Sequence, residues 1–150
     1  MAARDASIPL VERKCEACKA RGGEPVAMSS EEVAKHMLSL CPSWQISAEG
    51  DKISRTFKAK NFAAGIDFIN QIGALAEAEG HHPDLSLSGW NTVTVVMWTH
   101  SIQGLDINDF IVAAKSDLIR VTYSPKWLRE HPNVTAGVPP AAATQEQGIA

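Results

Sequence analysis

Two spacings of hydrophobic side chains run along the chain, and the switches between them divide it into elements. Apolar residues three or four positions apart predict helices over residues 29–41, 61–79 and 106–118. Alternation of apolar and polar residues predicts strands over residues 44–47, 52–57, 85–87 and 93–100. This order, α-β-β-α-β-β-α, indicates an α+β fold in which three helices cover one face of a four-stranded antiparallel sheet.

The predicted helices begin at residues that can cap them. Ser29 is followed three positions later by Glu32, and Asp106 by Asp109, which is the pattern of a capping box. Asn61 is a suitable N-cap for the middle helix. We therefore expect all three helices to start at these positions.

The same periodicity predicts which side chains face the core. The hairpin and the helix after it are expected to bury Trp44, Ile46, Ile53, Phe57, Phe62, Ile66, Ile69, Ile72 and Leu75. The last strand is expected to place Val93, Val95, Met97 and Thr99 on one face and Thr94, Val96, Trp98 and His100 on the other. Because Val96 and Trp98 fall on the face without helices, we expect an oligomer contact there.

Composition limits the class of protein. The 150 residues suffice for one domain with its own core, and 45% hydrophobic with 21% charged residues are ordinary values for a globular protein. A net charge of −3 predicts no nucleic-acid or anionic-membrane surface, and no run of about 18 apolar residues is present. The N-terminus lacks the apolar stretch of a secretory signal. The cytoplasm is therefore the expected compartment, or a mitochondrion or plastid if the N-terminus has been processed.

Three regions are expected within the chain. Residues 1–28 lack periodicity and are predicted to form a loosely ordered arm. Residues 29–122 are predicted to form the folded domain. Residues 123–150 are predicted to be a C-terminal extension in which Trp127 and Leu128 can dock, followed by a tail that is largely disordered.

The three cysteines do not form a familiar metal or redox motif. Cys15 and Cys18 have C-x-x-C spacing, and Cys41 stands alone. A structural zinc site needs four ligands, and a thioredoxin-like motif follows a strand, which is not predicted before Cys15. We therefore expect reduced cysteines in an intracellular chain.

The candidate chemistry lies in a short span after the middle helix. His81, His82 and Pro83 follow a helix-ending glycine, while His100 closes a predicted strand and Asp109 opens a predicted helix. Histidine is the side chain whose ordinary pKa lies nearest to neutrality. Three histidines in this span therefore predict proton transfer or metal binding.

Three interpretations of these residues compete. Pro83 favours an extended backbone at His82, which points His81 and His82 to opposite sides and disfavours chelation of one ion by both. Taken singly, each residue also has an ordinary explanation as a loop, strand-end or capping side chain. Taken together, they favour a histidine acid/base catalyst whose imidazole is oriented by a carboxylate.

Several motifs of this region resemble those of the pterin-4a-carbinolamine dehydratase family. They are Gly80-His81-His82-Pro83-Asp84, Trp90-Asn91-x-Val93, Trp98-Thr99-His100 and Gly104-Leu105-x-x-Asn108-Asp109-Phe110, followed by Ala113-Ala114-Lys115. The resemblance covers about residues 29–120, and the Cys15-x-x-Cys18 arm is similar to that of longer members. Leu85 and Gly80 depart from the commonest pattern and resemble plant and algal members.

The resemblance implies a hydro-lyase that acts without metal or cofactor. It would remove water from 4a-hydroxytetrahydrobiopterin, or a related 4a-hydroxytetrahydropterin, to give the quinonoid dihydropterin in tetrahydrobiopterin recycling. The implied catalytic residues are His81, His82, His100 and Asp109, and the implied substrate-binding residues are His82, Pro83, Trp98 and Thr99. His81 and His100 would form the acid/base pair, His82 would help to hold the pterin, and Asp109 would orient a histidine.

The resemblance also implies protein partners. A homodimer or homotetramer is expected, and an aromatic amino acid hydroxylase is a candidate partner. The alternative function is a non-enzymatic scaffold or assembly factor, of the kind that supports transcription-factor dimerisation or rubisco assembly. All three histidines and Asp109 are present, which favours the enzyme because a non-enzymatic relative is free to lose them.

Overall fold

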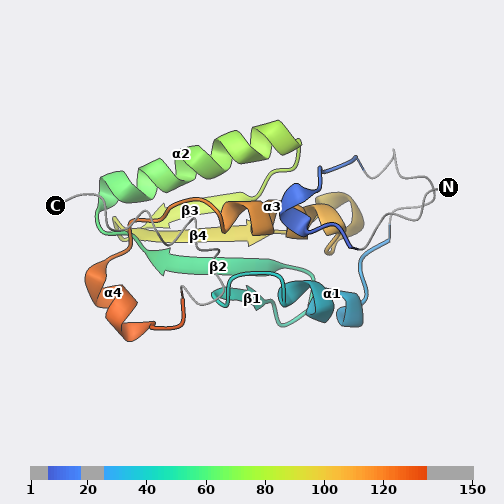
Figure 1. The fold of residues 1–150 in the computed structure, drawn as a ribbon, viewed down its shortest axis with the longest axis horizontal. Coiled ribbons are helices and arrows are strands. Elements are labelled where there is room, and N and C mark those ends of the chain that lie inside the picture. The colour runs from blue at the N-terminus through green and yellow to red at the C-terminus, as the bar shows by residue number, and fades with distance from the viewer. Residues whose placement is uncertain (1–6, 18–25, 135–150) are drawn as a thin grey trace.

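The computed structural model describes residues 7–17 and 26–134, and it has the predicted α+β architecture (Figure 1). The helices are α1 (Ser30–Met37), α2 (Phe62–Glu79), α3 (Ile107–Ser116) and α4 (Pro125–Glu130), with the short 3-10 helices η1 (Leu10–Glu12) and η3 (His100–Ile102). The strands are β1 (Trp44–Ile46), β2 (Ile53–Lys58), β3 (Asp84–Ser88) and β4 (Thr92–Met97).

The four strands form one antiparallel sheet in the order β1-β2-β4-β3. The central pair, β2 and β4, runs from Ile53 opposite Met97 to Lys58 opposite Thr92. After β2 the chain leaves the sheet to form α2 and then returns as β3 at the edge of the sheet, beside β4. The end of α2 therefore lies next to the end of β4.

Burial alternates along the strands because only one face of the sheet is covered. The buried residues of the two central strands are Ile53, Arg55, Phe57, Val93, Val95 and Met97. Thr94 and Val96 of the other face are partly exposed, as their period-two spacing predicted. Residues of α1, α2 and α3 complete the same hydrophobic core, so the predicted single helical layer is confirmed.

The predicted caps are confirmed where helices begin and end. The Ser29 side chain accepts a hydrogen bond from the Glu32 N–H, and the Glu32 carboxylate accepts one from the Ser29 N–H. Asn61 accepts from the Ala64 N–H at 2.8 Å and starts α2. Gly80 ends α2 with a φ of 65°, a left-handed conformation that glycine adopts without a Cβ clash.

The predicted apolar stripe of α2 is partly wrong. Ile72 is fully buried, but Phe62 and Ile66 are 57% and 39% exposed. The buried stripe is Gly65, Phe68, Ile72 and Ala76. A Cβ at Gly65 would lie 3.0 Å from Leu87 Cδ1, so the small residue lets the helix approach the sheet closely. Since α2 carries apolar residues on more than one side, spacing alone did not select the buried side.

One further core prediction is wrong, and one helix ends earlier than predicted. Ile46 is 43% exposed because it ends the edge strand β1, and Leu118 is 44% exposed because α3 ends before it, at Ser116. His36 of α1 is half-buried, with its ring centroid 5.3 Å from that of Phe110. Burial lowers the pKa of His36.

Segments on both sides of the predicted domain also contribute structure. In the arm, η1 places Leu10 in the hydrophobic core, and in the C-terminal extension α4 does the same with Trp127. Each segment docks through few apolar residues, which produce no periodic signal. The rest of the predicted arm and the tail, at residues 1–6, 18–25 and 135–150, lies outside the described residues.

A buried polar cluster joins the sheet to the end of α3. Arg55 Nη1 lies 3.4 Å from Asp117 Oδ1, and Arg55 Nη2 donates to the Tyr123 hydroxyl at 2.5 Å. Asp117 also accepts from the Cys41 N–H and the Trp44 Nε1–H, both at 2.8 Å. Burial raises the pKa of Asp117 despite the neighbouring Arg55 charge. This cluster fixes β1, β2 and the segment after α3 to one another.

Removal of the Asp117 carboxylate should destabilise the fold strongly. Asp117→Ala leaves Arg55, whose side chain is 3% exposed, as an uncompensated buried charge. We expect the free energy of unfolding to fall by about 3–5 kcal/mol, measured by urea denaturation. Asp67→Ala, which removes an exposed carboxylate from α2, is the control and should change it by less than about 0.5 kcal/mol. Equal effects of the two substitutions would contradict the assignment.

Candidate active site

Asp109 lies at the centre of the candidate site and is fully buried. It is the third residue of α3, and its carboxylate accepts a hydrogen bond from the Asp106 N–H at 2.9 Å, while Asp106 caps the helix in return. The predicted capping box is therefore confirmed. A buried carboxylate is costly unless it is fully hydrogen-bonded, so its other partners matter.

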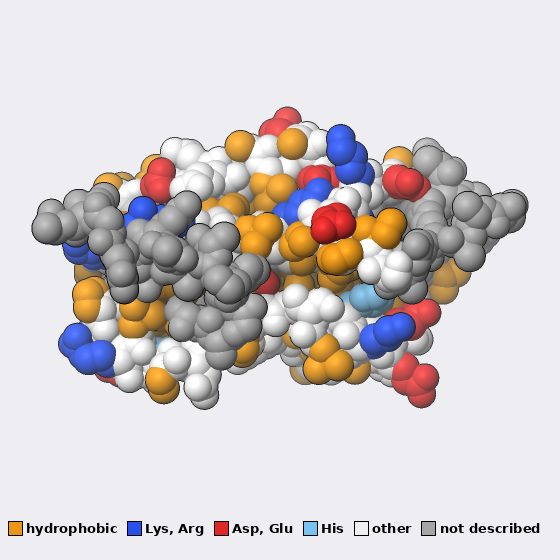
Figure 2. Space-filling model, in the orientation of Figure 1, with side chains coloured by type: hydrophobic (Ala, Val, Ile, Leu, Met, Phe, Trp, Pro, Cys, Tyr) orange, Lys and Arg blue, Asp and Glu red, His pale blue; other side chains and the backbone are white. Residues whose placement is uncertain are grey.

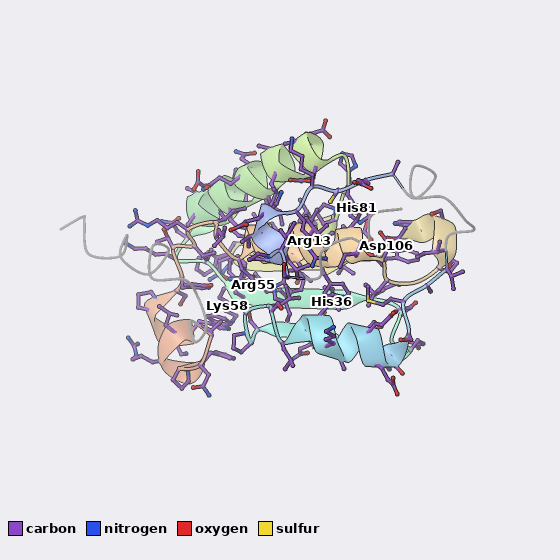
Figure 3. All side chains as sticks on the ribbon, turned by 45° about the vertical axis from the view of Figure 1, so that its right-hand side comes forward. Arg13, His36, Arg55, Lys58, His81 and Asp106 are labelled. Carbon is purple, nitrogen blue, oxygen red and sulfur yellow. The ribbon has the colours of Figure 1, made fainter. Side chains whose placement is uncertain are left out.

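The first of these partners is His81, which directly follows Gly80, the left-handed residue that ends α2. His81 Nε2 lies 2.6 Å from Asp109 Oδ1, and the His81 side chain is 14% exposed. Figure 3 shows His81 at the exit of α2 and Asp106 at the start of α3, at the same end of the molecule. An imidazole in contact with a carboxylate has a fixed orientation and a fixed tautomer.

The second partner is Thr99, which follows β4 and lies on its buried side. The Thr99 hydroxyl donates to Asp109 Oδ2 at 2.7 Å. A bridge between Thr99 and Gly104 closes the loop that contains η3. Residue 27 packs against this loop, and its close approach needs glycine, because a Cβ at Gly104 would lie 2.6 Å from the Cβ of Ala27.

His100 points to the other side of the backbone and forms a second group of side chains. Its ring centroid lies 3.8 Å from that of Trp98, and Trp98 Nε1–H donates to Asp84 Oδ2 at 2.9 Å. The Lys52 ammonium lies 4.4 Å from the Trp98 ring centroid. This group lies on the face of the sheet that the helices do not cover.

His82 is separated from both groups. Its side chain is 59% exposed, and its Nε2 lies 2.8 Å from Glu77 Oε1 of α2. His81 and His82 thus have different carboxylate partners, as their opposite directions in an extended segment predicted. Among residues 7–17 and 26–134, no group of three or more His, Cys, Asp or Glu side chains is placed to hold a metal ion.

The two groups of side chains share both of their backbone segments. Residues 81–84 supply His81 to the first group and Asp84 to the second, and residues 98–100 supply Thr99 to the first and Trp98 with His100 to the second. Consecutive Cα atoms are about 3.8 Å apart, so the groups are close neighbours. A molecule bound where these two segments lie side by side could exchange protons with titratable groups of both.

The sequence did not predict the contacts that brace this site from the side of α2. Glu79, the last residue of α2, forms an ion pair with Lys115 of α3 and accepts from the Cys15 N–H at 2.9 Å. Burial acts to raise the pKa of Glu79, but the hydrogen bonds from Cys15 and Lys115 outweigh it and lower this pKa. Only the position of Glu79 beside the histidine motif could have drawn attention to it.

Cys15 is packed beside Glu79 and is not activated. Burial, together with the Glu79 charge, raises the pKa of the Cys15 thiol to about 12. The thiolate is the form that attacks electrophiles and binds metals, and it is scarce at neutral pH with such a pKa. The structure therefore gives Cys15 a packing role, and Cys18 lies outside the described residues.

The face of the molecule seen in Figure 1 carries charged side chains of both signs. Figure 2 shows acidic and basic side chains interspersed on the face seen in Figure 1, where the structure describes it. A cavity of about 310 Å³ between the arm and α3 is lined by residues that include Arg13, Glu16 and Asn108, but by none of the predicted site residues. No helix in the described parts of the chain is long and apolar enough to cross a membrane.

The chain is similar in sequence to known proteins. A family model described as pterin 4 alpha carbinolamine dehydratase matches residues 26–119, which include every predicted site residue. A protein of Syntrophotalea carbinolica named as a pterin-4-alpha-carbinolamine dehydratase is 47% identical over 112 residues, which cover 73% of this chain and 96% of that protein.

Two further relatives extend the comparison. Pterin-4-alpha-carbinolamine dehydratase 2, mitochondrial, of Arabidopsis thaliana is 40% identical over 114 residues, which are 75% of this chain and 59% of the plant protein. The crystal structure of a transcriptional coactivator/pterin dehydratase from Brucella melitensis aligns with a TM-score of 0.56 and 30% identity, over 61% of this chain and 95% of that one. Sequence and fold thus agree on one family.

The ion pair at the end of α2 should make stability depend on pH in acid. Because the pKa of Glu79 is lower in the folded protein than its ordinary 4.5, its contribution is complete above about pH 5 and is lost as the pH falls through the folded-state pKa. We expect Glu79→Gln to be less stable than the unmodified protein at neutral pH and to approach it in acid. Urea denaturation across this range measures the difference, and a constant difference would contradict the prediction.

Proposed function

The chain belongs to the pterin 4 alpha carbinolamine dehydratase family, and we propose that His81, His100 and Asp109 carry its acid/base chemistry. The reaction removes water from a 4a-hydroxytetrahydropterin and yields the quinonoid dihydropterin. The observation that carries the proposal is the 2.6 Å contact between His81 Nε2 and the fully buried Asp109 carboxylate.

The reaction requires two proton transfers. The C4a hydroxyl leaves readily only when an acid protonates it, and a base must take the proton from N5 as the C4a–O bond breaks. Positioned side chains that make such transfers typically contribute roughly 10²- to 10⁴-fold to the rate. Two histidines on neighbouring segments can divide these two tasks.

The geometry favours His81 as the base. In neutral His81, an Nε2–H that donates to Asp109 leaves the lone pair on Nδ1, which can accept a proton. The imidazolium formed by this transfer is then stabilised by the adjacent carboxylate. His100 takes the role of the acid, with its ring oriented by contact with Trp98.

The other predicted residues have supporting roles. His82 is exposed on the loop after α2, where it can contact the pterin, and Pro83 keeps that loop extended. Thr99 was expected to contact the substrate, but its hydroxyl is hydrogen-bonded to Asp109. We therefore assign Thr99 a positioning role, in which it holds the carboxylate that orients His81.

The alternative function, the protein partners and the compartment are also proposals. The Brucella structure is titled as a coactivator as well as a dehydratase, which is the observation in favour of a scaffold function. His81, His82 and His100 are all present in this chain, so we place the enzyme first. A homodimer or homotetramer and an aromatic amino acid hydroxylase stay the predicted partners. The cytoplasm stays the predicted compartment, and the Arabidopsis relative named mitochondrial supports the organelle alternative.

Loss of either catalytic histidine should abolish most activity without unfolding the protein. We expect His81→Ala and His100→Ala each to lower kcat by roughly 10²- to 10⁴-fold in a stopped-flow dehydration assay with chemically generated 4a-hydroxytetrahydropterin. His131→Gln, which alters an exposed histidine after α4, is the control and should keep its activity. Near-unchanged rates in both alanine variants would reject the assignment.

The same assay tests whether a metal takes part. Proton transfer by histidines and a carboxylate requires no metal ion, so dehydration should proceed at the same rate after dialysis against a chelator. The control adds the metal back in excess. A rate that falls in chelator and returns with metal would replace the proposed mechanism with a metal-dependent one.

A further inference from the structure

Residues 7–17 of the arm lie across α3 at the end where Asp109 is found. Figures 1 and 3 both show η1 in front of α3, and Figure 3 places Arg13 on this segment near the start of that helix. Leu10 anchors the segment in the hydrophobic core, with 7% of its surface exposed. These residues precede the region that the family model matches, which begins at residue 26.

The first clasp on the arm is the side chain of Asn108. Its Oδ1 accepts from the Glu16 N–H at 3.2 Å, and its Nδ2 donates to the Glu16 C=O at 2.7 Å. Asn108 thereby binds both backbone polar groups of a single arm residue, and it is only 4% exposed. The residue that follows Asn108 is Asp109.

The second clasp is Glu79, the last residue of α2. Glu79 accepts from the Cys15 N–H, and its other carboxylate oxygen binds Lys115 of α3. The Cys15 thiol lies 3.7 Å from the Asn108 C=O, so the two clasps hold consecutive arm residues. Glu79 precedes His81 by two residues.

The arm is therefore attached to the two segments that carry His81 and Asp109. Its attachment points, Glu79 and Asn108, lie within two residues of them in the sequence. Displacement of a reacting group by about 1 Å can cost roughly 10²-fold in rate. Resting on the proposed function, we propose that residues 7–17 are a positioning element for the dehydratase reaction, which holds His81 and Asp109 in contact through Glu79 and Asn108.

A merely structural role would have different consequences. An arm that only covers apolar surface would change the free energy of unfolding and leave the geometry of His81 intact. A positioning arm sets the orientation of the His81 ring, so its loss would lower kcat and free the ring to change tautomer. These two roles are separated by readouts at His81 itself.

A pair of substitutions at one exposed arm residue makes this test in the full-length chain. Glu16→Pro removes the backbone N–H that donates a hydrogen bond to Asn108 Oδ1. Glu16→Ala removes only the side chain and keeps that N–H. Neither substitution changes a residue of the site. We expect Glu16→Pro to lower kcat about tenfold or more with KM changed less than about twofold, and Glu16→Ala to match the unmodified protein.

Nitrogen-15 NMR of the His81 ring supplies a readout that does not depend on turnover. A single tautomer is expected in the unmodified chain and in Glu16→Ala, and a mixture of tautomers in Glu16→Pro. A Glu16→Pro protein that is less stable but keeps kcat and the single tautomer would overturn the proposal. If the unmodified chain has no dehydratase activity, the proposed function fails, while the tautomer comparison still tests the arm.

A second variant guards against a Glu16→Pro protein that does not fold. Leu10→Ala loosens the same segment by removing its apolar anchor and leaves every hydrogen-bonding group of the clasps in place. A lower kcat and a mixture of His81 tautomers in a folded Leu10→Ala protein support the proposal. Unmodified kcat and tautomer, in a variant whose arm amides show increased hydrogen exchange, would reject it.

Discussion

One buried carboxylate holds three elements of this fold together. Asp109 caps α3 through the Asp106 N–H, binds the end of β4 through Thr99 and binds the exit of α2 through His81. Because a fully buried charge must be satisfied by its surroundings, each of these partners is fixed by the same requirement. The hydrogen bonds that stabilise the Asp109 carboxylate also orient the His81 imidazole. The contacts that hold this end of the sheet together are therefore the same contacts that position the site.

The proposed site depends on two short backbone segments that lie side by side. An extended segment sends alternate side chains to opposite sides, and residues 98–100 use this property to place Thr99 on the buried side and Trp98 with His100 on the open side. Residues 81–84 do the same with His81 and Asp84. A planar substrate beside these segments would meet one histidine in contact with a carboxylate and another in contact with an aromatic ring, which are different environments for an acid and a base.

Much of this could be predicted from the sequence because it is local. Capping boxes and the glycine that ends α2 depend on residues within one turn, and the faces of β4 follow from period two. The contacts that were missed join distant parts of the chain: Arg55 with Asp117, and Cys15 with Glu79. No local pattern encodes such pairings. The buried side of α2 was misjudged for a related reason, since it is set by the close approach at Gly65 and not by the largest apolar residues.

Asp109 has structural contacts as well as its proposed role beside His81. This affects which residues indicate activity in a divergent relative. A descendant that had abandoned catalysis would still need a capped α3 and a satisfied end of β4, so retention of an aspartate at this position carries little information about chemistry. His100 is exposed, so the fold should lose little stability when it is replaced. Under the proposed mechanism, His100 is therefore the more sensitive indicator of a working enzyme, and Asp109 is an indicator of the scaffold.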